Sequence, residues 1–440
     1  MGGGKSKEIK RTSKVDLTKY NARVDRVNIK GLERTYSDYV SRAVNNLFLA
    51  KTFADVLLET NNALSELHEL RVFKNVRAHI DVSKGEKATQ NGYEVTFEGL
   101  ELTRITGGIG AELGQNDGSG TAELTTPNIF GRGESLSLKA SYSYIKTSEL
   151  NFKFSKPFFH TILGDYKPET SFTIVKHSSI APWSKYRLDD FGLLFDFSFL
   201  LPFGSHSLQY ELGVQELSAL DKQTPFFIRE HCGPRLASTL RHLYAFDTRD
   251  STVFPTNGFY VKTTTELIGS AISRLGLLKN ETHGELNLPL FAGMSVQLCG
   301  RLGVLLTDKR KESVPIHRHL FPGGPQTLRG FEVAGVGPHR EGVALGCESY
   351  WVSGLHLWSP LPFNRYFGGF GNLFRTHFFY NFGSANAFTA DHLRSTAGIG
   401  LAIRLGERAR IEFNYCHPIL HQKGDRLVKG FQFGIGFDFV

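Results

Sequence analysis

Residues 430–439 alternate strictly between apolar side chains and small or polar ones. The apolar positions are Phe431, Phe433, Ile435, Phe437 and Phe439. A repeat of two is typical of a β-strand with one apolar face, because successive side chains of a strand point to opposite sides of the sheet. We interpret residues 431–439 as the strand that closes a barrel, since a bilayer tolerates no unpaired sheet edge.

The same repeat of two continues through the chain after Gly99. It is clearest in residues 136–144, 150–154 and 409–415. Counting gives about 16 candidate strands at roughly 21 residues per strand and turn, which fits transmembrane strands of ~9–11 residues joined by loops. The sequence therefore predicts a mainly β chain, with an antiparallel transmembrane β-barrel of about 16 strands over residues 100–440. A soluble all-β sandwich shows the same repeat but rarely has so many strands in series.

The composition is compatible with this class of protein. The chain contains no run of about 18 apolar residues, so a membrane-spanning helix is not expected. The 36 Phe and 15 Tyr suit the aromatic girdles of a membrane barrel, and the 46 Gly suit turns and close strand packing. A net charge of +8 fits a lumen or surface that meets acidic partners, although a solvated basic surface explains it more simply.

Residues 21–99 have a different pattern, in which spacings of three and four alternate with spacings of two. In chain order the pattern predicts one strand, two helices and two strands, over residues 27–31, 36–47, 53–67, 72–82 and 93–97. Thr35 is the expected cap of the first helix. The order β-α-α-β-β predicts one small α+β domain, and residues 1–20 are expected to form a disordered tail.

Two further features concern localisation and modification. Residues 1–14 are charged and lack the apolar segment of a secretory signal, so we expect a barrel that reaches the mitochondrial outer membrane from the cytosol. Gly2 and Ser6 fit the M-G-x-x-x-S pattern of N-myristoylation, with an unmodified Gly- and Lys-rich tail as the alternative. The four cysteines are far apart and form no C-x-x-C pair, so neither a disulfide scaffold nor a zinc site is predicted.

Enzyme motifs are not found. Gly108-x-Gly110 and Gly369-x-Gly371 lack the third glycine of a dinucleotide-binding loop and have no predicted helix behind them. His317 and the histidine two residues later form an H-x-H pair. No carboxylate pair or thiolate lies nearby in the sequence to complete a metal site. We predict that the protein is not an enzyme and binds no cofactor, no metal and no nucleic acid.

Three motifs together carry a resemblance to a known family. Leu328-Arg329-Gly330-Phe331 lies in a glycine-rich stretch, Asp247-Thr-Arg249-Asp250 lies in the middle of the predicted barrel, and an N-x-F-G-x-G sequence begins at Asn128. In this order they resemble the signature segments of the POTRA-containing outer-membrane insertase barrels. The β-α-α-β-β segment is similar to a single POTRA domain. With one such domain and no signal peptide, the chain resembles the barrel-subunit family of the mitochondrial sorting and assembly machinery.

The resemblance implies that residues 308–346 fold into the lumen, where Arg329 is pinned to the inner wall. The family often places an acidic residue opposite this arginine, whereas this chain has Asn381 and His356 at the matching positions. We therefore expect Arg329 to bond to Asn381 or His356, or to pair with another acid such as Glu348, since a buried guanidinium needs partners. Arg71 stands where the family favours glycine.

The resemblance also implies a function: insertion and assembly of β-barrel precursors in the mitochondrial outer membrane, with the POTRA-like domain in the intermembrane space. Client strands would pair at a lateral gate between the first and last barrel strands. The expected gate residues are Ile105, Gly107, Gly108, Gly110, Gln432, Gly434, Phe437 and Phe439. The expected partners are β-barrel precursors, accessory subunits of the assembly complex and outer-membrane lipids.

The last strand has a second resemblance, because Gln432-x-Gly434-x-x-Phe437-x-Phe439 is similar to the mitochondrial β-signal, polar-x-Gly-x-x-hydrophobic-x-hydrophobic. Other interpretations stay open. The glycines of residues 103–113 could instead serve the curvature of a tightly closed barrel. The alternative function is a protein-conducting export or import pore of the same superfamily, and a passive porin is a third possibility.

Overall fold

The computed structural model describes residues 16–84, 88–113, 118–159, 161, 163–269, 276–307, 314–361, 368–386, 392–406, 409–436 and 439–440. The chain divides into two compact units. The first contains Met1–Ile105 with Thr126–Ser135 and Pro157–Asp165, and the second contains the remaining residues to Val440. Gly2 and most of the predicted tail lie outside the described residues, whereas Leu17–Lys19 form a short 3-10 helix.

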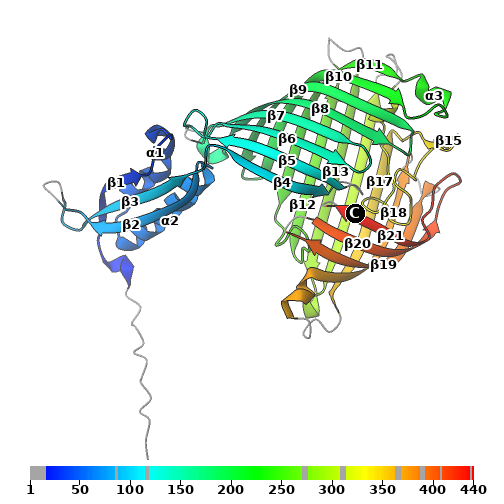
Figure 1. The fold of residues 1–440 in the computed structure, drawn as a ribbon. Coiled ribbons are helices and arrows are strands. Elements are labelled where there is room, and N and C mark those ends of the chain that lie inside the picture. The colour runs from blue at the N-terminus through cyan, green and yellow to red at the C-terminus, as the bar shows by residue number, and fades with distance from the viewer. Residues whose placement is uncertain are drawn as a thin grey trace, which may run out of the picture. The chain divides into compact units, whose positions relative to one another are not determined.

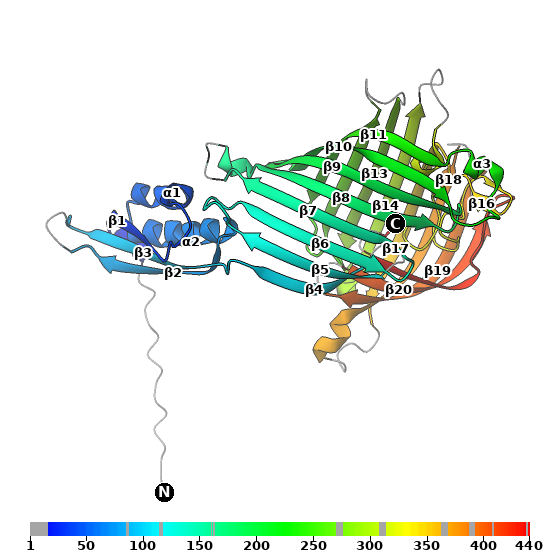
Figure 2. The ribbon, with the colours of Figure 1, turned by 45° about the horizontal axis from the view of Figure 1, so that its top comes forward.

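The first unit is a three-stranded mixed sheet with two helices, shown in Figure 2. Its elements are β1 (Arg23–Lys30), α1 (Ser37–Asn45), α2 (Phe53–Glu69), β2 (Phe73–Val82) and β3 (Gly92–Glu101). The strand order is β1-β3-β2, with β1 parallel and β2 antiparallel to β3. Tyr39, Leu47, Leu67 and Phe97 are fully buried in its core, so both helices and the sheet share one apolar centre. The predicted β-α-α-β-β order is confirmed.

The predicted cap of the first helix is wrong. α1 begins at Ser37 after an N-cap residue, Tyr36, that makes no side-chain cap bond. The Thr35 hydroxyl instead donates to the carboxylate of Glu101 at 2.6 Å, because that acid is buried against this turn and also accepts the Thr35 main-chain N–H. α2 has a full capping box, in which the Thr52 hydroxyl accepts from the N–H of Asp55 and the Asp55 carboxylate accepts from the N–H of Thr52.

The turn before β2 keeps the geometry that glycine favours although an arginine occupies it. Arg71 has a φ of 57°, in the left-handed region. At this position an arginine therefore holds a backbone conformation that glycine adopts more readily.

The second unit is a sheet of 16 antiparallel strands that curves round into a barrel (Figure 1). The strands are β4 (Thr106–Leu113), β5 (Gly118–Pro127), β6 (Ser135–Ser143), β7 (Ser148–Pro157), β8 (Glu169–Ala181), β9 (Tyr186–Leu201), β10 (Gly204–Ala219), β11 (Gly233–Asp247), β12 (Gly258–Ile268), β13 (Leu277–Pro289), β14 (Ser295–Thr307), β17 (Ser349–Pro360), β18 (Phe374–Ala385), β19 (Arg394–Leu405), β20 (Ala409–Leu420) and β21 (Gly430–Gly436). The predicted fold class is confirmed.

Shorter elements lie between these strands. They are α3 (Phe226–Arg229), the hairpin of β15 (His339–Arg340) and β16 (Val343–Ala344), and the 3-10 helices at Asn46–Leu49, Gly164–Tyr166, Phe291–Gly293, Ile316–Arg318 and Gly368–Leu373. None of the helices in the described part of the chain is long and apolar enough to cross a membrane.

Burial along the strands is the reverse of that in a water-soluble sandwich. On β21, Phe431 and Phe433 are exposed, whereas Gln432 and Gly434 are buried. The interior of the barrel likewise buries Arg329 and Glu412 completely. An apolar outer face and a polar inner face are what a barrel in a bilayer requires.

The sheet begins at β4 and ends at β21. In the part of the chain that the structure describes, β4 pairs with β5 and β21 pairs with β20, and no ladder joins β4 to β21. The prediction that the last strand continues to Phe439 is wrong: β21 ends at Gly436, and Phe439 is buried at 2% exposure. Phe437 lies outside the described residues.

Candidate functional site

The segment between β14 and β17 folds into the barrel interior, which we call the lumen. Its described part begins at residue 314, and residues 308–313 of the predicted loop lie outside the description. Leu328, Arg329 and Phe331 are all 0% exposed. Gly330 has a φ of 79°, a left-handed conformation that turns the chain between the arginine and the phenylalanine. The Leu-Arg-Gly-Phe motif is therefore the buried tip of this segment, which we call the lumen loop (residues 314–346).

Arg329 pairs with Glu412 of β20. Its Nη2 lies 2.7 Å and its Nε 3.1 Å from the same carboxylate oxygen, Oε2. Its Nη1 donates to the main-chain oxygen of Val440. The guanidinium also lies over the rings of Phe379 and Phe439, at 5.3 and 5.6 Å from the ring centroids. The charge is thus removed from water but has partners on every side, as burial requires.

Glu412 is the centre of a larger network. Its second oxygen, Oε1, accepts from Nε of Arg410 at 2.8 Å, and Oε2 also accepts from Nδ2 of Asn414 at 3.0 Å. The three residues are spaced by two along β20, so their side chains share its lumen face. The alternation of residues 409–415 contained this signal, but it predicted only a strand, and Glu412 was missed as the partner of Arg329.

The expected partners of Arg329 need correction. Glu348 is exposed and lies just before β17, and it makes no ion pair with Arg329, whose carboxylate partner is Glu412. Asn381 is buried and donates from Nδ2 to the Val440 oxygen at 2.9 Å, so it shares an acceptor with Arg329 but does not bond to it. A buried guanidinium pairs better with a buried carboxylate than with an exposed carboxylate, because the exposed carboxylate stays solvated by water.

His356 belongs to the same network by a longer route. Its Nδ1 lies 3.2 Å from Nδ1 of His377, and Nε2 of His377 lies 2.8 Å from Oδ1 of Asn414. The His377 ring stacks on Trp358 with the centroids 4.2 Å apart. Among the described residues no group of three or more His, Cys, Asp or Glu side chains is placed to hold a metal ion.

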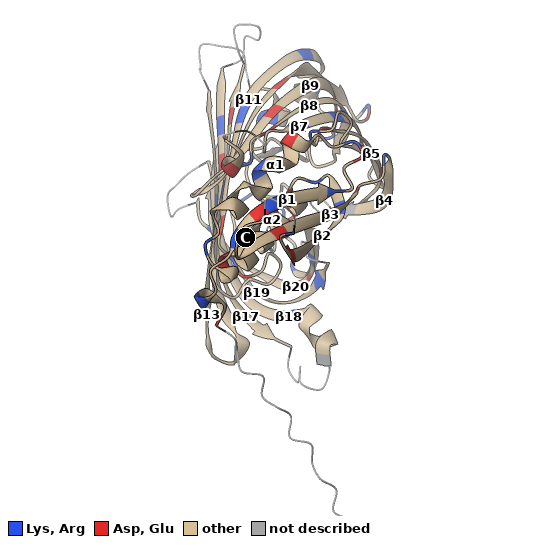
Figure 3. Ribbon diagram, turned by 90° about the vertical axis from the view of Figure 1, so that its left-hand side faces the viewer, with Lys and Arg blue, Asp and Glu red and all other residues tan. Residues whose placement is uncertain are grey.

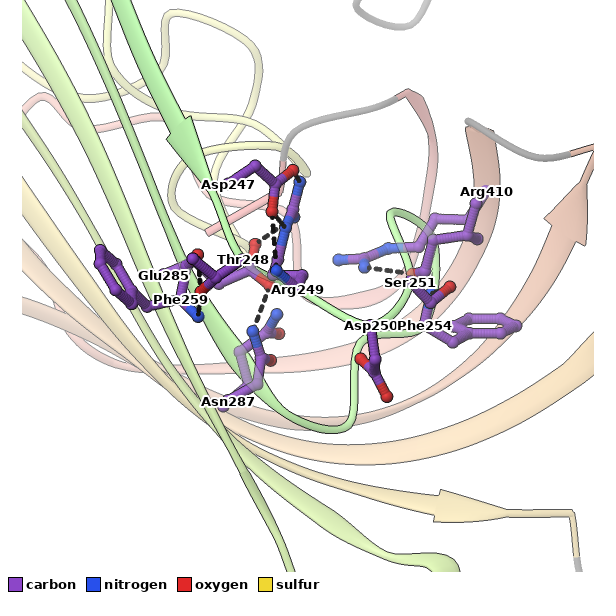
Figure 4. A network of polar contacts seen from close by, with 12 residues as sticks. Asp247, Thr248, Arg249, Asp250, Ser251, Phe254, Phe259, Glu285, Asn287 and Arg410 are labelled. Carbon is purple, nitrogen blue, oxygen red and sulfur yellow. Dashed lines mark hydrogen bonds and ion pairs between the residues drawn. The ribbon is translucent and has the colours of Figure 1, made fainter. Parts of the chain in front are cut away.

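The Asp-x-Arg-Asp motif forms the turn after β11 (Figure 4). Arg249 donates from Nε and Nη2 to the two oxygens of Asp247, at 2.9 and 2.8 Å, and from Nη1 to Glu285 of β13 at 3.0 Å. Its guanidinium lies 4.1 Å from the ring centroid of Tyr260. Arg249 therefore links the turn to three consecutive strands of the barrel wall, β11, β12 and β13.

Asp250 shapes the same turn. Its carboxylate accepts the main-chain N–H groups of Thr256 and Asn257 at 2.9 and 3.2 Å. Burial tends to raise the pKa of Asp250, but these bonds and the Thr256 hydroxyl outweigh burial and lower it. The acid is thus held in its charged form as the organising group of the turn.

The tip of this turn contacts the network around Glu412. Nη1 of Arg410 donates to the main-chain oxygen of Val253 at 3.1 Å. Phe254 packs on Trp358, with ring centroids 6.1 Å apart. Because strand direction alternates, the β11–β12 turn and the lumen loop enter from opposite ends of the barrel. The two sequence motifs therefore meet in the lumen through Arg410 and Glu412, neither of which is part of either motif.

The lumen loop is also bonded to the last strand. The Gln432 side chain accepts from the N–H of Gly330 at 2.9 Å and donates to the main-chain oxygen of Phe331 at 2.8 Å. Nε2 of Gln326 donates to the main-chain oxygen of Ile435 at 2.7 Å. The N–H of Val428, in the turn before β21, donates to the oxygen of Gly330 at 2.9 Å.

The expected gate residues thus separate into two groups. Gln432, Gly434 and Phe439 all face the lumen loop. Gly107, Gly108 and Gly110 lie on β4, at the other end of the sheet, and Ile105 lies just before it, 68% exposed. In the described residues no strand pairing brings the two groups together.

The third motif organises a turn of the first unit. Asn128, with a φ of 54°, accepts on Oδ1 from the N–H of Gly133 at 2.8 Å and donates from Nδ2 to the Thr35 hydroxyl at 2.8 Å. The oxygen of Gly131 accepts from the N–H of Tyr36 at 2.9 Å. Within each unit, ribbon segments of Lys and Arg lie interspersed with those of Asp and Glu in this view (Figure 3).

Comparison with known proteins identifies the class. Residues 128–439 match the Omp85 superfamily domain. The structure of BamA from Haemophilus ducreyi lacking POTRA domains 1–3 superposes with a TM-score of 0.74 at 19% identity, over 94% of this chain and 84% of that one. This likeness supports the barrel fold.

Sequence relatives define the family more narrowly. A SAM50-like protein of Drosophila melanogaster is 49% identical over 100% of this chain and 98% of its own length. The sorting and assembly machinery component 50 homologs of Xenopus laevis (B form) and Homo sapiens are 37% and 35% identical, each over 95% of this chain and 90% of the relative. The chain belongs to the SAM50 family of the Omp85 superfamily. It is a β-barrel protein of the mitochondrial outer membrane, in a family of assembly proteins that are not enzymes.

Proposed function

We propose that the chain assembles β-barrel precursors by pairing their strands at the seam between β4 and β21. Family membership implies the assembly of β-barrel proteins in the mitochondrial outer membrane. The observation that supports a seam at this place is the strand order, in which β4 and β21 are the two edge strands of one sheet. Edge strands with unpaired main-chain N–H and C=O groups are templates for an added strand.

The composition of β4 supports its role as the receiving edge. Gly107, Gly108 and Gly110 give it few side chains, and a methyl group on Gly108 would meet no atom of the described residues within 4 Å. Ile109, between them, is 94% exposed. A strand with so little side-chain packing is weakly fixed in register, so it can exchange partners at low cost.

The lumen network supports the opposite role for β21. Its bonds to the lumen loop, and those of Glu412 on β20, fix the C-terminal side of the seam to the barrel interior. One side of the seam is then held while the other can move. We propose that the first unit faces the intermembrane space, and that β-barrel precursors, accessory subunits and outer-membrane lipids are the partners.

The alternative is a protein-conducting pore of the same superfamily. Such a pore needs a continuous passage through the lumen. Here the lumen loop and the β11–β12 turn meet inside the barrel at Arg410 and Glu412, and both residues are buried. This packing argues for strand exchange at the wall over conduction through the interior.

Cysteine cross-linking during import tests the proposal. Gly108→Cys on β4 is paired with a cysteine in the last strand of a radiolabelled porin precursor, and Leu240→Cys, exposed on the outer face of β11, is the matched control. We expect a disulfide with position 108 while the precursor is being assembled and none with position 240. If position 108 never captures the precursor although assembly proceeds, the seam is not the entry site.

A further inference from the structure

The outer wall of the barrel has a cavity of about 720 Å³ over β6 to β10, which we call the outer-wall cavity. Register identifies its face. Phe191 of β9, which is 59% exposed, pairs with Lys176 of β8 on one side and with Val214 of β10 on the other. Residues that pair directly across strands share a face of the sheet, so these three side chains all point away from the lumen. His177 and Asp190 border the cavity from the lumen face, where their Nδ1 and Oδ2 atoms lie 3.7 Å apart.

The outer-wall cavity lies where the apolar band of the outer face ends. Along β9 the outward side chains change from apolar to charged at Asp189 and Arg187. The same change comes at Glu216 in β10 and at Lys176 in β8. The five apolar outward side chains of β9 are Phe191, Leu193, Phe195, Phe197 and Phe199. The end of an apolar band is the level at which the headgroups of a bilayer surround a membrane barrel.

Four charged side chains of β8, β9 and β10 line this cavity on the outer face, and they are only partly paired. Nε of Arg187 donates to Oδ1 of Asp189 at 3.1 Å and to Oγ of Ser178 at 3.0 Å. Lys176 and Glu216 make no hydrogen bond or ion pair with the residues that the structure describes. One base and one acid are therefore available to a ligand.

The two acids of the cavity are direct cross-strand neighbours. Glu216 of β10 pairs with Asp189 of β9, and like charges in this position destabilise a sheet. Arg187 is bonded to Asp189 and not to Glu216. A positive group of a ligand would therefore stabilise Glu216, and a negative group would stabilise Lys176.

We propose that the outer-wall cavity binds one zwitterionic phospholipid, with its phosphate at Lys176 and its ammonium group at Glu216. Leu150, Phe191 and Val214, all exposed on the outer face, border the site on its apolar side and would contact the acyl chains. The equal number of bases and acids favours a headgroup with both charges over an anionic one. None of these strands is an edge strand of the sheet, so the inference does not depend on the seam.

Native mass spectrometry of the full-length chain in detergent tests this proposal. The delipidated barrel is offered phosphatidylethanolamine, phosphatidylcholine and phosphatidylglycerol in equal amounts and with the same acyl chains. We expect one bound zwitterionic lipid, retained about tenfold better than phosphatidylglycerol. A preference for phosphatidylethanolamine would show that the ammonium group donates hydrogen bonds, and equal retention of the two zwitterionic lipids would show that its charge suffices.

A paired variant tests the residues of the cavity. Lys176→Gln with Glu216→Gln removes one charge of each sign, so the net charge of the chain is unchanged. Lys222→Gln with Glu230→Gln does the same at exposed positions between β10 and β11 that do not line the cavity, and is the matched control. We expect the first pair to lower retention of the zwitterionic lipid about tenfold and the control pair to leave it unchanged. The spectrum counts lipid on folded barrels, so the comparison does not depend on their abundance.

A single substitution tests the charge complementarity. Glu216→Lys replaces the acid that would bind the ammonium group and leaves the bases in place. We expect this variant to prefer phosphatidylglycerol over the zwitterionic lipids. An unchanged preference would show that Glu216 does not contact the headgroup.

Photo-cross-linking locates the bound lipid. Phosphatidylethanolamine with a diazirine in its acyl chain, at one molecule per barrel, should label peptides that contain Phe191 or Val214. It should spare Leu286, which is exposed on the outer face of β13. Even labelling of the outer wall, or a wild-type preference for phosphatidylglycerol, would mean an annular lipid only and overturn the site. Capture of a precursor by Gly108→Cys on β4 would still stand, so this failure is distinct from failure of the proposed function.

Discussion

The two end strands of the barrel sheet differ in how they are held. β21 is bonded through Gln432 and the Ile435 carbonyl to the lumen loop, and it lies beside the buried carboxylate of Glu412. β4 pairs with β5, and a methyl group on its Gly108 would contact none of the residues that the structure describes. Glycine thus acts differently at two positions of these strands. On β21, Gly434 makes room for a tight contact with Pro325, whereas on β4 Gly108 faces open space among the described residues.

The largest effect is expected for the buried acid on the C-terminal side of the proposed seam. Glu412→Ala would leave the guanidinium groups of Arg329 and Arg410 buried without their shared carboxylate. Removing one partner of a buried ion pair typically destabilises by about 3–5 kcal/mol. We expect loss of most folded barrel in mitochondria, measured by heat-modifiable gel mobility. Glu348→Ala, at an exposed acid, is the control, and equal loss in both variants would contradict the role of the network.

Arg329→Lys is expected to have the next largest effect. Lysine keeps the positive charge but cannot bond at once to Glu412 and the Val440 oxygen with the planar fork of arginine. Hydrogen bonds to charged groups contribute about 1.5–3 kcal/mol, so we expect a loss in this range in urea unfolding of the barrel in lipid vesicles. Arg340→Lys, at an exposed arginine of the same loop, should be neutral. Wild-type stability in Arg329→Lys would show that the charge alone suffices.

Gln432→Leu tests the bonds between the lumen loop and β21 without changing charge. It leaves the N–H of Gly330 and the oxygen of Phe331 unpaired in a buried place, at a cost of about 1–3 kcal/mol. We expect faster proteolysis of the lumen loop in the purified barrel. Gln422→Leu, in the turn before β21, serves as the comparison variant. If the lumen loop is as well protected from proteolysis in Gln432→Leu as in the wild type, the two end strands do not differ in how they are held.

The smallest effect on stability is expected on β4. Gly108→Ala adds a methyl group where no described residue has an atom within 4 Å, so stability should change by less than about 0.5 kcal/mol. The same change at Gly434 forces a clash with Pro325. Comparing the two variants in one unfolding assay sharpens the contrast, and similar losses at both sites would remove it.

Sequence alone predicts much of this fold because its signals are local. The alternation in residues 409–415 and 430–436 indicates strands without knowledge of their neighbours, and the Leu-Arg-Gly-Phe motif marks the lumen loop. The partner of Arg329 is a different problem. Glu412 lies 83 residues away, and only the barrel topology brings β20 beneath the loop. Glu412 is the one acid in residues 409–415, but the chain has 43 Asp and Glu residues, and no local rule selects this one as the partner of Arg329.

Two local predictions failed for a related reason. The period-two pattern predicts that the last strand continues to Phe439. The Phe439 ring instead turns into the lumen, because two guanidinium groups lie there. Thr35 has the chemistry of a helix cap, but the buried Glu101 competes for its hydroxyl. In both cases a charged group distant in the sequence outweighs a local preference, and such groups can be placed only once the fold is known.

Hydrogen–deuterium exchange of the main-chain amides of the barrel in lipid bilayers measures how firmly β4 and β21 are each held. A free receiving edge on β4 and a held strand at β21 predict that peptides containing residues 106–113 exchange faster than peptides containing residues 430–436. Peptides from β20 should be the best protected. Equal and strong protection of β4 and β21 would mean a sealed barrel, and it would contradict the account of a seam with one fixed and one exchangeable side.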